Sequence, residues 1–345
     1  MLPSKAPRLM AISSRREAPR PSSGRARPVM AGLGIFLVAT GLLLRFYAAP
    51  RLIAAPANIY LKDTLLAPQA SYFDQGALTT RTGVTLTFTS TLRGDPGAST
   101  SKIAVWDSFT VLEDLKNRAQ VISTYQRAAF DRRTGQLVHC CGAAVNDDTR
   151  VRQNGILLYF WPIGTHKATY QVFDTNTDRA WPAIYRGTAR VEGITAYRFT
   201  QRIPPTQVQQ LPGVPSSLVG LPGPARNVVA DRYFQASNTY WVDPRTGVPL
   251  DVEERIHSVL RGPGSQDGLV VADADLKMSE PSRRSLAALA RQNAVSIGTL
   301  RVTGPLGGGI LGLLLILAGT VPFGRGRRKG PNSGAADAPA ALPPT

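Results

Sequence analysis

The chain has 345 residues, with 40 Lys and Arg against 23 Asp and Glu, 32 Gly, 27 Pro and two Cys. Two cysteines exclude a disulfide-rich scaffold, and the length is ample for a fold held by a hydrophobic core. The net charge of +17 invites a nucleic-acid role, but about half of the excess lies at the two ends of the chain. Because the sequence also lacks a nucleic-acid-binding motif, we predict no nucleic-acid partner.

The first predicted element is an uncharged apolar run from Pro28 to Leu44. At about 1.5 Å per residue it spans roughly 26 Å, slightly less than a bilayer core of about 30 Å. Arg45 can reach the interface along the helix, where Phe46 and Tyr47 supply an aromatic anchor. We therefore predict a transmembrane helix over 28–49 that is retained as a signal anchor. A cleaved signal peptide is the alternative, although the stretch after the run lacks a good small-residue cleavage site.

Residues 50–281 contain short β-branched or aromatic segments separated by turns rich in Gly, Pro and Asp. This pattern is typical of antiparallel β structure. The predicted fold class is therefore a mainly β domain of antiparallel sheets, with a transmembrane helix on either side. The predicted strands cover residues 84–89, 103–111, 121–130, 155–160, 168–173, 188–191, 196–199, 239–242 and 252–259.

The turn pattern Asp-x-Arg-Thr-Gly occurs twice, once from Asp131 to Gly135 and once from Asp243 to Gly247. In such a turn the Asp accepts backbone N–H groups and the Gly takes a positive φ, and Pro244 presets φ in the second turn. We predict these five residues to be structural turn positions. The recurrence suggests two similar β units, but a turn sequence that is common in β proteins explains it equally well.

A proline-rich segment over residues 203–226 lies between the two predicted β units. Its six prolines are expected to exclude regular strand or helix, so we predict a surface connection there. Farther along, residues 282–300 contain no proline and carry Leu286 and Leu289. They predict a juxtamembrane helix that leads into the second span.

The second apolar run, Val302 to Gly324, is long enough to cross a membrane unaided. Three of its glycines lie four residues apart, which is the spacing of small-residue helix packing. Such a face can receive either the first helix of the same chain or a helix of another copy. The candidate helix-packing residues are Gly304, Gly308 and Gly312, with Gly34 and Gly41 in the first run.

The charges beside the two runs predict the orientation of the chain. Residues 1–27 carry seven Lys and Arg against Glu17, and residues 325–345 carry four against Asp337. By the positive-inside rule both tails are cytoplasmic, and their composition predicts disorder. We therefore predict a two-pass plasma-membrane protein whose domain 50–281 is extracytoplasmic.

The sequence has no Gly-x-Ser-x-Gly elbow, no His-Glu-x-x-His, no phosphate loop and no dinucleotide fingerprint after a strand. We therefore predict a non-enzymatic protein with no catalytic, metal or cofactor-binding residues and no cofactor. The acidic groups lack the spacing of a calcium site, and we interpret them as solvated turns or strand faces: Asp147 with Asp148, Asp251 with Glu253 and Glu254, and Asp273 with Asp275.

The two cysteines, Cys140 and Cys141, are adjacent and follow His139. This cluster lacks the second, spaced ligand pair of a structural zinc site. A vicinal disulfide needs a distorted intervening peptide, so we do not expect the two cysteines to bond to each other. The histidines His166 and His257 lie far from this cluster in the sequence.

Several aromatic and turn segments resemble a known family. They are residues 44–50, 159–165 with Tyr170 and Asp174, 185–187, 191–193, 197–199, 242–244 and 246–247. On these segments the chain resembles an actinobacterial envelope family labelled Porin PorA, from about Val29 to Phe323. The resemblance implies a two-span envelope membrane protein and, by the family label, a channel component. It supplies no functional residues.

Two functions remain open at this stage. The first is a non-catalytic, membrane-anchored envelope protein whose β domain binds a lipid, glycan or protein partner. The second is a subunit of an oligomeric channel, because two helices cannot enclose a pore and the strands lack the lipid-facing alternation of a membrane barrel. The expected partners are membrane lipid, an envelope ligand, and further copies of the chain bound through the transmembrane helices.

Overall fold

The computed structural model describes residues 26–265 and 267–321. These residues form two compact units, one of helices from the two ends of the chain and one of residues Arg45–Thr303. The two predicted disordered tails lie outside the described residues, except for Ala26 and Arg27.

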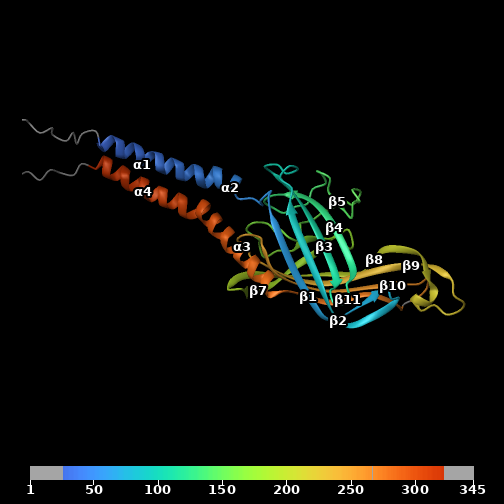
Figure 1. The fold of residues 1–345 in the computed structure, drawn as a ribbon. Coiled ribbons are helices and arrows are strands. Elements are labelled where there is room, and N and C mark those ends of the chain that lie inside the picture. Colours follow the sequence, from blue (N-terminus) through green and yellow to red (C-terminus); the bar gives the residue numbers. More distant parts are fainter. Residues whose placement is uncertain (1–25, 266, 322–345) are drawn as a thin grey trace, which may run out of the picture. The chain divides into compact units, whose positions relative to one another are not determined.

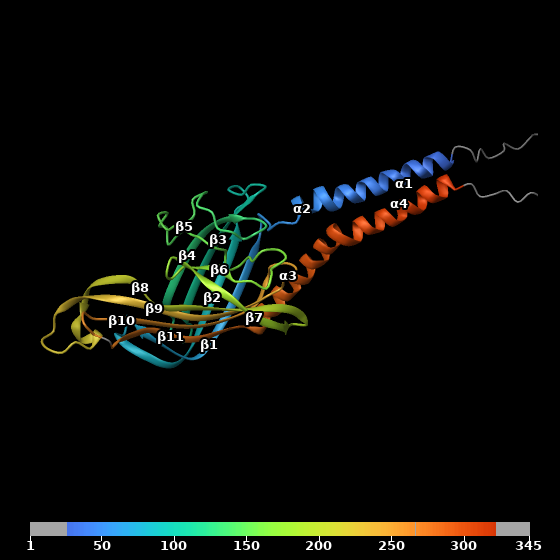
Figure 2. The same cartoon turned by 180° about the vertical axis from the view of Figure 1, so that it is seen from behind.

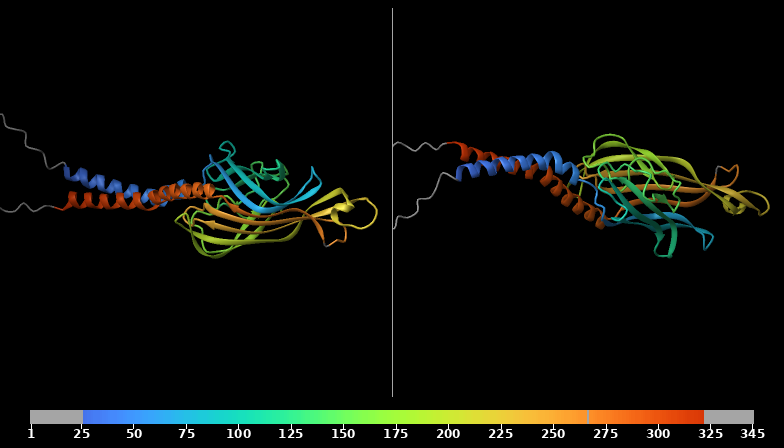
Figure 3. Two further views of the ribbon diagram at one scale, coloured as in Figure 1. Left: turned by 60° about the horizontal axis from the view of Figure 1, so that its bottom comes forward. Right: turned by 90° about the horizontal axis from the view of Figure 1, so that it is seen from above.

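The helical unit consists of α1 (Ala26–Leu43) and α4 (Gly304–Thr320), which run side by side (Figure 3). Both helices are apolar on every face, as expected for segments surrounded by lipid. The chain continues after α1 through a π-helical turn, η1 (Leu44–Ala48), and a short helix, α2 (Ala49–Leu52). Another π-helical turn, η3 (Thr299–Thr303), precedes α4. In the described part of the chain, two helical stretches are long and apolar enough to cross a membrane, Arg27–Leu52 and Glu280–Thr320.

The second unit is built on one curled sheet of eleven strands, all paired antiparallel (Figure 1). The order across the sheet is β5-β4-β3-β2-β1-β11-β10-β9-β8-β7-β6. The strands are β1 (Tyr60–Asp74), β2 (Thr79–Gly94), β3 (Ile103–Asp114), β4 (Ala119–Asp131), β5 (Ala144–Val145), β6 (Tyr170–Asp174), β7 (Arg179–Val191), β8 (Ile194–Pro215), β9 (Asn227–Val242), β10 (Pro249–Arg261) and β11 (Gly268–Met278). The predicted fold class, a mainly β domain with two apolar helices, is confirmed.

Two segments link the edges of the curled sheet, one between β4 and β5 and one between β5 and β6. In the first, Leu137 bridges Phe130 of β4; in the second, Ile156 bridges both Gln136 of the first segment and Val172 of β6. These bridges connect β4 and β6, which lie near opposite ends of the sheet order, through the two segments. The inner face of the sheet is therefore enclosed, and most of the hydrophobic core lies there.

Helix α3 (Glu280–Gly298) packs against the core of this unit, and it overlaps the helix predicted over 282–300. The hydroxyl of Ser279 caps its first turn by accepting from the Ser282 backbone N–H. The Ser282 hydroxyl in turn accepts from the backbone N–H of Thr64 on β1, at 2.9 Å. These bonds join the start of α3 to the centre of the sheet, where Leu286 is buried.

The proline-rich segment was predicted wrongly over its first half. Strand β8 continues to Pro215 and pairs with β9 in a long hairpin that is visible in Figure 2. Its register with β9 shifts between Ile203 and Thr206 and twice more before Pro215. Such irregularities accommodate prolines, because a residue without a backbone N–H is tolerated where the ladder is interrupted.

The remaining differences concern strands that were not predicted and one strand that was predicted wrongly. Strands β1 and β11 were missed, although they pair with each other at its centre. Residues 155–160 were predicted as a strand, but there the structure has only an isolated bridge at Ile156. The strands form one sheet within one compact unit. A duplication of two similar β units stays a prediction.

Candidate functional site

The two Asp-x-Arg-Thr-Gly turns have the hydrogen bonds expected from their sequence. Oδ1 of Asp131 accepts from the backbone N–H groups of Arg133 and Thr134, each at 2.9 Å. Asp243, the equivalent residue of the second turn, is fully buried, and its Oδ2 accepts from the Thr246 hydroxyl at 3.0 Å. Pro244 follows Asp243 at the second turn position. These side chains are occupied within their turns, so they have a structural role.

Both turns contact the same aromatic segment. Gly135 and Gly247 take positive φ values of 69° and 74°. A side chain at Gly135 would overlap the carbonyl oxygen of Phe160, and one at Gly247 would overlap that of Trp161. Both aromatic side chains are buried in the core. Glycine is therefore required twice over, for its backbone conformation and for the close approach.

Four of the five helix-packing glycines lie along the contact between α1 and α4. The backbones of Gly34 and Gly312 meet, and a Cβ at Gly312 would lie 2.6 Å from the Gly34 carbonyl oxygen. A Cβ at Gly41 would lie 3.1 Å from the Pro305 carbonyl oxygen. Gly308 is looser, with 3.7 Å to the Leu37 carbonyl oxygen.

The fifth predicted glycine, Gly304, is the first residue of α4. Gly319 was not among the predicted glycines, although a Cβ there would lie 2.8 Å from the Arg27 carbonyl oxygen. Gly319 lies seven residues after Gly312, about two helical turns, so the spacing could have predicted that both lie on the same face. The glycines thus let the two helices of one chain approach closely.

The interior of the β unit contains a cavity of about 80 Å³. Its lining comes from β2, β3, β4, β6, β8, β9, β10 and β11, so strands from both ends of the sheet order enclose it. A second cavity, of about 30 Å³, adjoins it and shares Phe88, Leu158, Tyr159 and Glu254 with it. Helix α3 contributes Leu286 to the lining of the second cavity.

Glu254 of β10 lines both cavities. Its side chain is half-buried, and among the described residues its carboxyl group forms no hydrogen bond and has no positively charged neighbour. Burial, with a smaller contribution from the negative charge of Asp174, raises the pKa of Glu254 to about 7. Burial also raises the pKa of Asp63, in the second cavity, to about 6, and it raises the pKa of Asp174. The cavities therefore hold carboxyl groups that are poorly stabilised in their charged form.

A buried polar network forms one wall of the larger cavity. The Tyr240 hydroxyl donates to Oε1 of Gln201 at 2.7 Å, and Nδ2 of Asn238 donates to the same oxygen at 3.0 Å. Nδ2 of Asn238 also donates to the Tyr240 hydroxyl at 3.0 Å. These two contacts require the nitrogen of the Asn238 amide on this side, which leaves Oδ1 without a partner in the described structure.

The acidic group of β10 was assigned to a solvated face, and for Glu254 that assignment was wrong. Side chains alternate along a strand, so Val252, Glu254 and Ile256 face inward while Asp251 and Glu253 face outward. The apolar residues two positions before and after Glu254 were the signal that could have placed it inside.

The other acidic groups do form contacts at the surface. Asp148 pairs with Arg150 at 2.8 Å, and Asp273 pairs with His257 at 2.7 Å. Asp275 pairs with Arg255. The described residues contain no group of three or more His, Cys, Asp or Glu side chains placed to hold a metal ion.

Comparison with known proteins gives the family. A sequence model of the family described as Porin PorA matches residues 28–321. The chain belongs to the Porin PorA family. Together with the two apolar helices, this membership places it among membrane proteins.

One curated relative is Porin PorA of Corynebacterium resistens (strain DSM 45100 / JCM 12819 / GTC 2026 / SICGH 158). It is 25% identical over 231 residues, which cover 49% of this chain and 56% of the relative. The chain thus matches little more than half of that relative's length. This alignment agrees with the family assignment.

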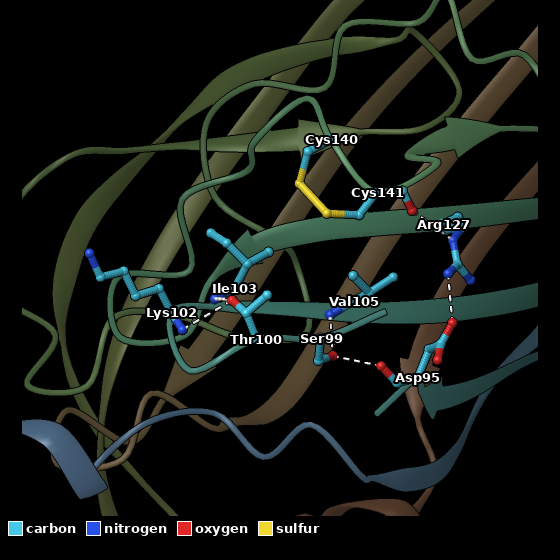
Figure 4. Close-up of a disulfide and its surroundings, with 9 residues drawn as sticks. All are labelled: Asp95, Ser99, Thr100, Lys102, Ile103, Val105, Arg127, Cys140 and Cys141. Carbon is cyan, nitrogen blue, oxygen red and sulfur yellow. Dashed lines mark hydrogen bonds and ion pairs between the residues drawn. A yellow bond between two sulfur atoms is a disulfide. The ribbon is translucent and has the colours of Figure 1, made fainter. Parts of the chain in front are cut away.

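In this PorA-family chain the two cysteines are bonded to each other, contrary to the expectation from the sequence. Figure 4 shows the disulfide between Cys140 and Cys141. Cys141 has a left-handed backbone conformation, with φ 61°, and its carbonyl oxygen accepts from Nε of Arg127 at 3.2 Å. Arg127 also pairs with Asp95 at 2.6 Å and with Asp107 at 2.8 Å. The turn conformation brings the adjacent sulfurs together, which an extended strand end would not.

Proposed function

We propose that the chain is a non-enzymatic subunit of an oligomeric channel in the plasma membrane. The observation that carries this proposal is the Porin PorA match over residues 28–321. The described part of a single copy offers two apolar helices, which pack against each other and cannot enclose water. A pore therefore requires several copies around a common axis.

The outer surface of the helix pair supports association in a membrane. Phe36, Ile310 and Leu313 are about 60% exposed within the chain, so lipid or another copy must cover them. Gly32 and Gly307 meet no atom within 4 Å of an added Cβ. They leave room for a neighbouring helix to approach.

The proposed topology has two spans, with both termini in the cytoplasm and the β unit outside. It follows from the basic residues beyond each apolar run and from the positive-inside rule. The first span serves as a signal anchor in this arrangement. The expected partners in the membrane are lipids and further copies of the chain.

Planar bilayers test the channel proposal directly. Purified full-length protein is expected to give discrete conductance steps, with a frequency that rises more steeply than linearly with protein density. Substitution Gly307→Leu should reduce the step frequency if copies meet at this face. Gly298→Leu, which precedes the predicted span over 302–324 and also has no near contacts, should not. Silent bilayers at high density of demonstrably inserted protein would rule out the channel.

A second candidate function is favoured by the interior cavity. In this reading the β unit binds an envelope ligand, either a lipid, a glycan or part of a protein, while the two helices anchor it. A cavity that combines apolar side chains with several hydrogen-bonding groups is typical of small-molecule sites. Native mass spectrometry of the full chain should then detect a bound molecule that is lost when the cavity is filled by Ala236→Phe.

A further inference from the structure

The charged groups in the interior cavities are all acidic. Glu254 and Asp174 line the larger cavity, and Asp63 and Glu254 line the smaller one. No Lys, Arg or His is among the residues that line either cavity in the described structure. The cavities therefore have a negative potential whenever any of these carboxyl groups is ionised.

The hydrogen-bonding groups in the cavity wall also favour a ligand that donates hydrogen bonds. The Glu254 carboxyl forms no hydrogen bond among the described residues. Oδ1 of Asn238, which lies opposite Glu254 on β9, has no hydrogen-bond partner there either. Gln201 and Tyr240 are already bonded to each other and to Asn238. A ligand that supplies N–H donors would satisfy acceptors that the protein leaves open.

Apolar side chains line part of both cavities, beside the polar groups of the wall. Phe88, Leu158 and Ile256 lie in the lining of the larger cavity with Glu254, and Leu65 and Leu286 lie in that of the smaller one. A carboxylate in such surroundings interacts strongly with a single positive charge, because little water screens the pair. The apolar walls suit a short hydrocarbon chain attached to that charge.

We infer that the interior cavity binds the ammonium group of a small aliphatic amine, with the Glu254 carboxylate as its counter-ion. This inference rests on the second candidate function, in which the β unit binds a ligand. The cavity of about 80 Å³ limits the ligand group that enters to a few non-hydrogen atoms. A larger molecule would place only its amino end there.

Binding of a cation should depend on pH, because only the charged form of Glu254 attracts it. The groups that face Glu254 are Asp63 of β1, Asp174 of β6, Tyr240 of β9 and Tyr159. None of these can become positive, and the two other carboxyls reinforce the preference for a cation. With a Glu254 pKa of about 7, the affinity should rise about tenfold from pH 6 to pH 8.

The test uses the full chain in a neutral maltoside detergent, with n-butylammonium chloride as the probe in isothermal titration calorimetry. Butan-1-ol and sodium butyrate are the comparison probes of similar size, and protein-free micelles give the blank. We expect butylammonium to bind at least tenfold more tightly than either comparison probe. Glu254→Gln should abolish this preference. Glu253→Gln is the matched control, because it removes one charge from the opposite face of the same strand.

Three results would overturn the inference. They are equal binding of butan-1-ol and butylammonium, a preference for butyrate, and an unchanged amine preference in Glu254→Gln. If butan-1-ol alone binds, the cavity still binds a ligand and only the amine assignment fails. If no probe binds and native mass spectrometry detects no bound molecule, the ligand-binding function fails with it. The comparison of probes uses the unaltered chain, so it does not depend on the folding of a variant.

Discussion

The backbone N–H of Trp161 donates to the carbonyl oxygen of Gly247 at 3.1 Å. The backbone N–H of Leu157 makes the same kind of bond to Gly135, at 3.0 Å. The two Asp-x-Arg-Thr-Gly turns thus hold one segment between β5 and β6, although they lie far apart in the sequence. This segment closes the curled sheet around its core, so the two glycines should be important for stability.

Replacing Gly247 by alanine should destabilise the β unit more than positive φ alone would. Gly264 is a matched control, because it also has φ 74° but has open space around an added Cβ. We expect Gly264→Ala to cost about 1 kcal/mol and Gly247→Ala on the order of 2 kcal/mol more, owing to overlap with the Trp161 carbonyl oxygen. Urea unfolding of the full chain in detergent measures both. If both variants lose the same free energy of unfolding, the overlap with the Trp161 carbonyl oxygen does not add to the destabilisation.

Substitution Gly312→Val should separate α1 from α4. Its Cβ would lie 2.6 Å from the Gly34 carbonyl oxygen and 2.8 Å from Cγ2 of Val38. Gly307→Val is the control, because nothing lies within 4 Å of its added Cβ. Far-ultraviolet circular dichroism in detergent should give a lower melting temperature for the helical signal in Gly312→Val only. A similar loss in both variants would point to helix propensity as the cause.

Stability should decrease as the pH rises toward neutrality, because burial raises the pKa of Glu254 from 4.5 to about 7. The native state then binds more protons than the unfolded state over this range, so deprotonation favours unfolding. We expect Glu254 to account for a loss on the order of 2 kcal/mol between pH 4.5 and pH 7.5. Denaturant unfolding at a series of pH values measures it.

The Glu254→Gln variant should lose this dependence chiefly between pH 6 and pH 7.5. Burial raises the pKa values of Asp63 and Asp251 to about 6, so these groups maintain a dependence of the same sign below pH 6. Glu253→Gln should follow the unaltered protein throughout. The assignment is refuted if Glu254→Gln and Glu253→Gln have the same pH profile.

The disulfide between Cys140 and Cys141 predicts the reactivity of the exposed loop that contains it. Iodoacetamide should add no mass to the unreduced protein and two carbamidomethyl groups after reduction with phosphine. Reduced protein should fold as before, because the loop is also held by Arg127, which pairs with Asp95 and Asp107. Alkylation of the protein without prior reduction would contradict the disulfide.

Local signals in the sequence predicted much of this protein. The two apolar runs, the Asp-x-Arg-Thr-Gly turns and most strands depend on residues close together in the chain. The placement of Glu254 also had a local signal, because Val252 and Ile256 share its strand face. The neighbouring acidic residues Asp251 and Glu253 mask this signal, because they give the segment the composition of a solvated strand face.

The pairing of β1 with β11, and the two turns on either side of residues 157–161, had no comparable signal. The β1–β11 pairing joins parts of the chain about 200 residues apart, and the two turns lie about 110 residues apart. A strand records its own alternation but not the identity of its neighbour, and many registers satisfy the same alternation. The vicinal disulfide was missed for a similar reason, because it depends on the left-handed backbone of Cys141.

By itself, the sequence determined two apolar helices around a mainly β domain, and it also predicted turn residues and packing glycines. Hydrophobic runs, alternation and turn preferences act over a few residues, so they can be recognised without the fold. Only the tertiary structure decided that the sheet closes around an acidic cavity. That outcome depends on which distant strands meet, since each wall of the cavity comes from a different part of the chain.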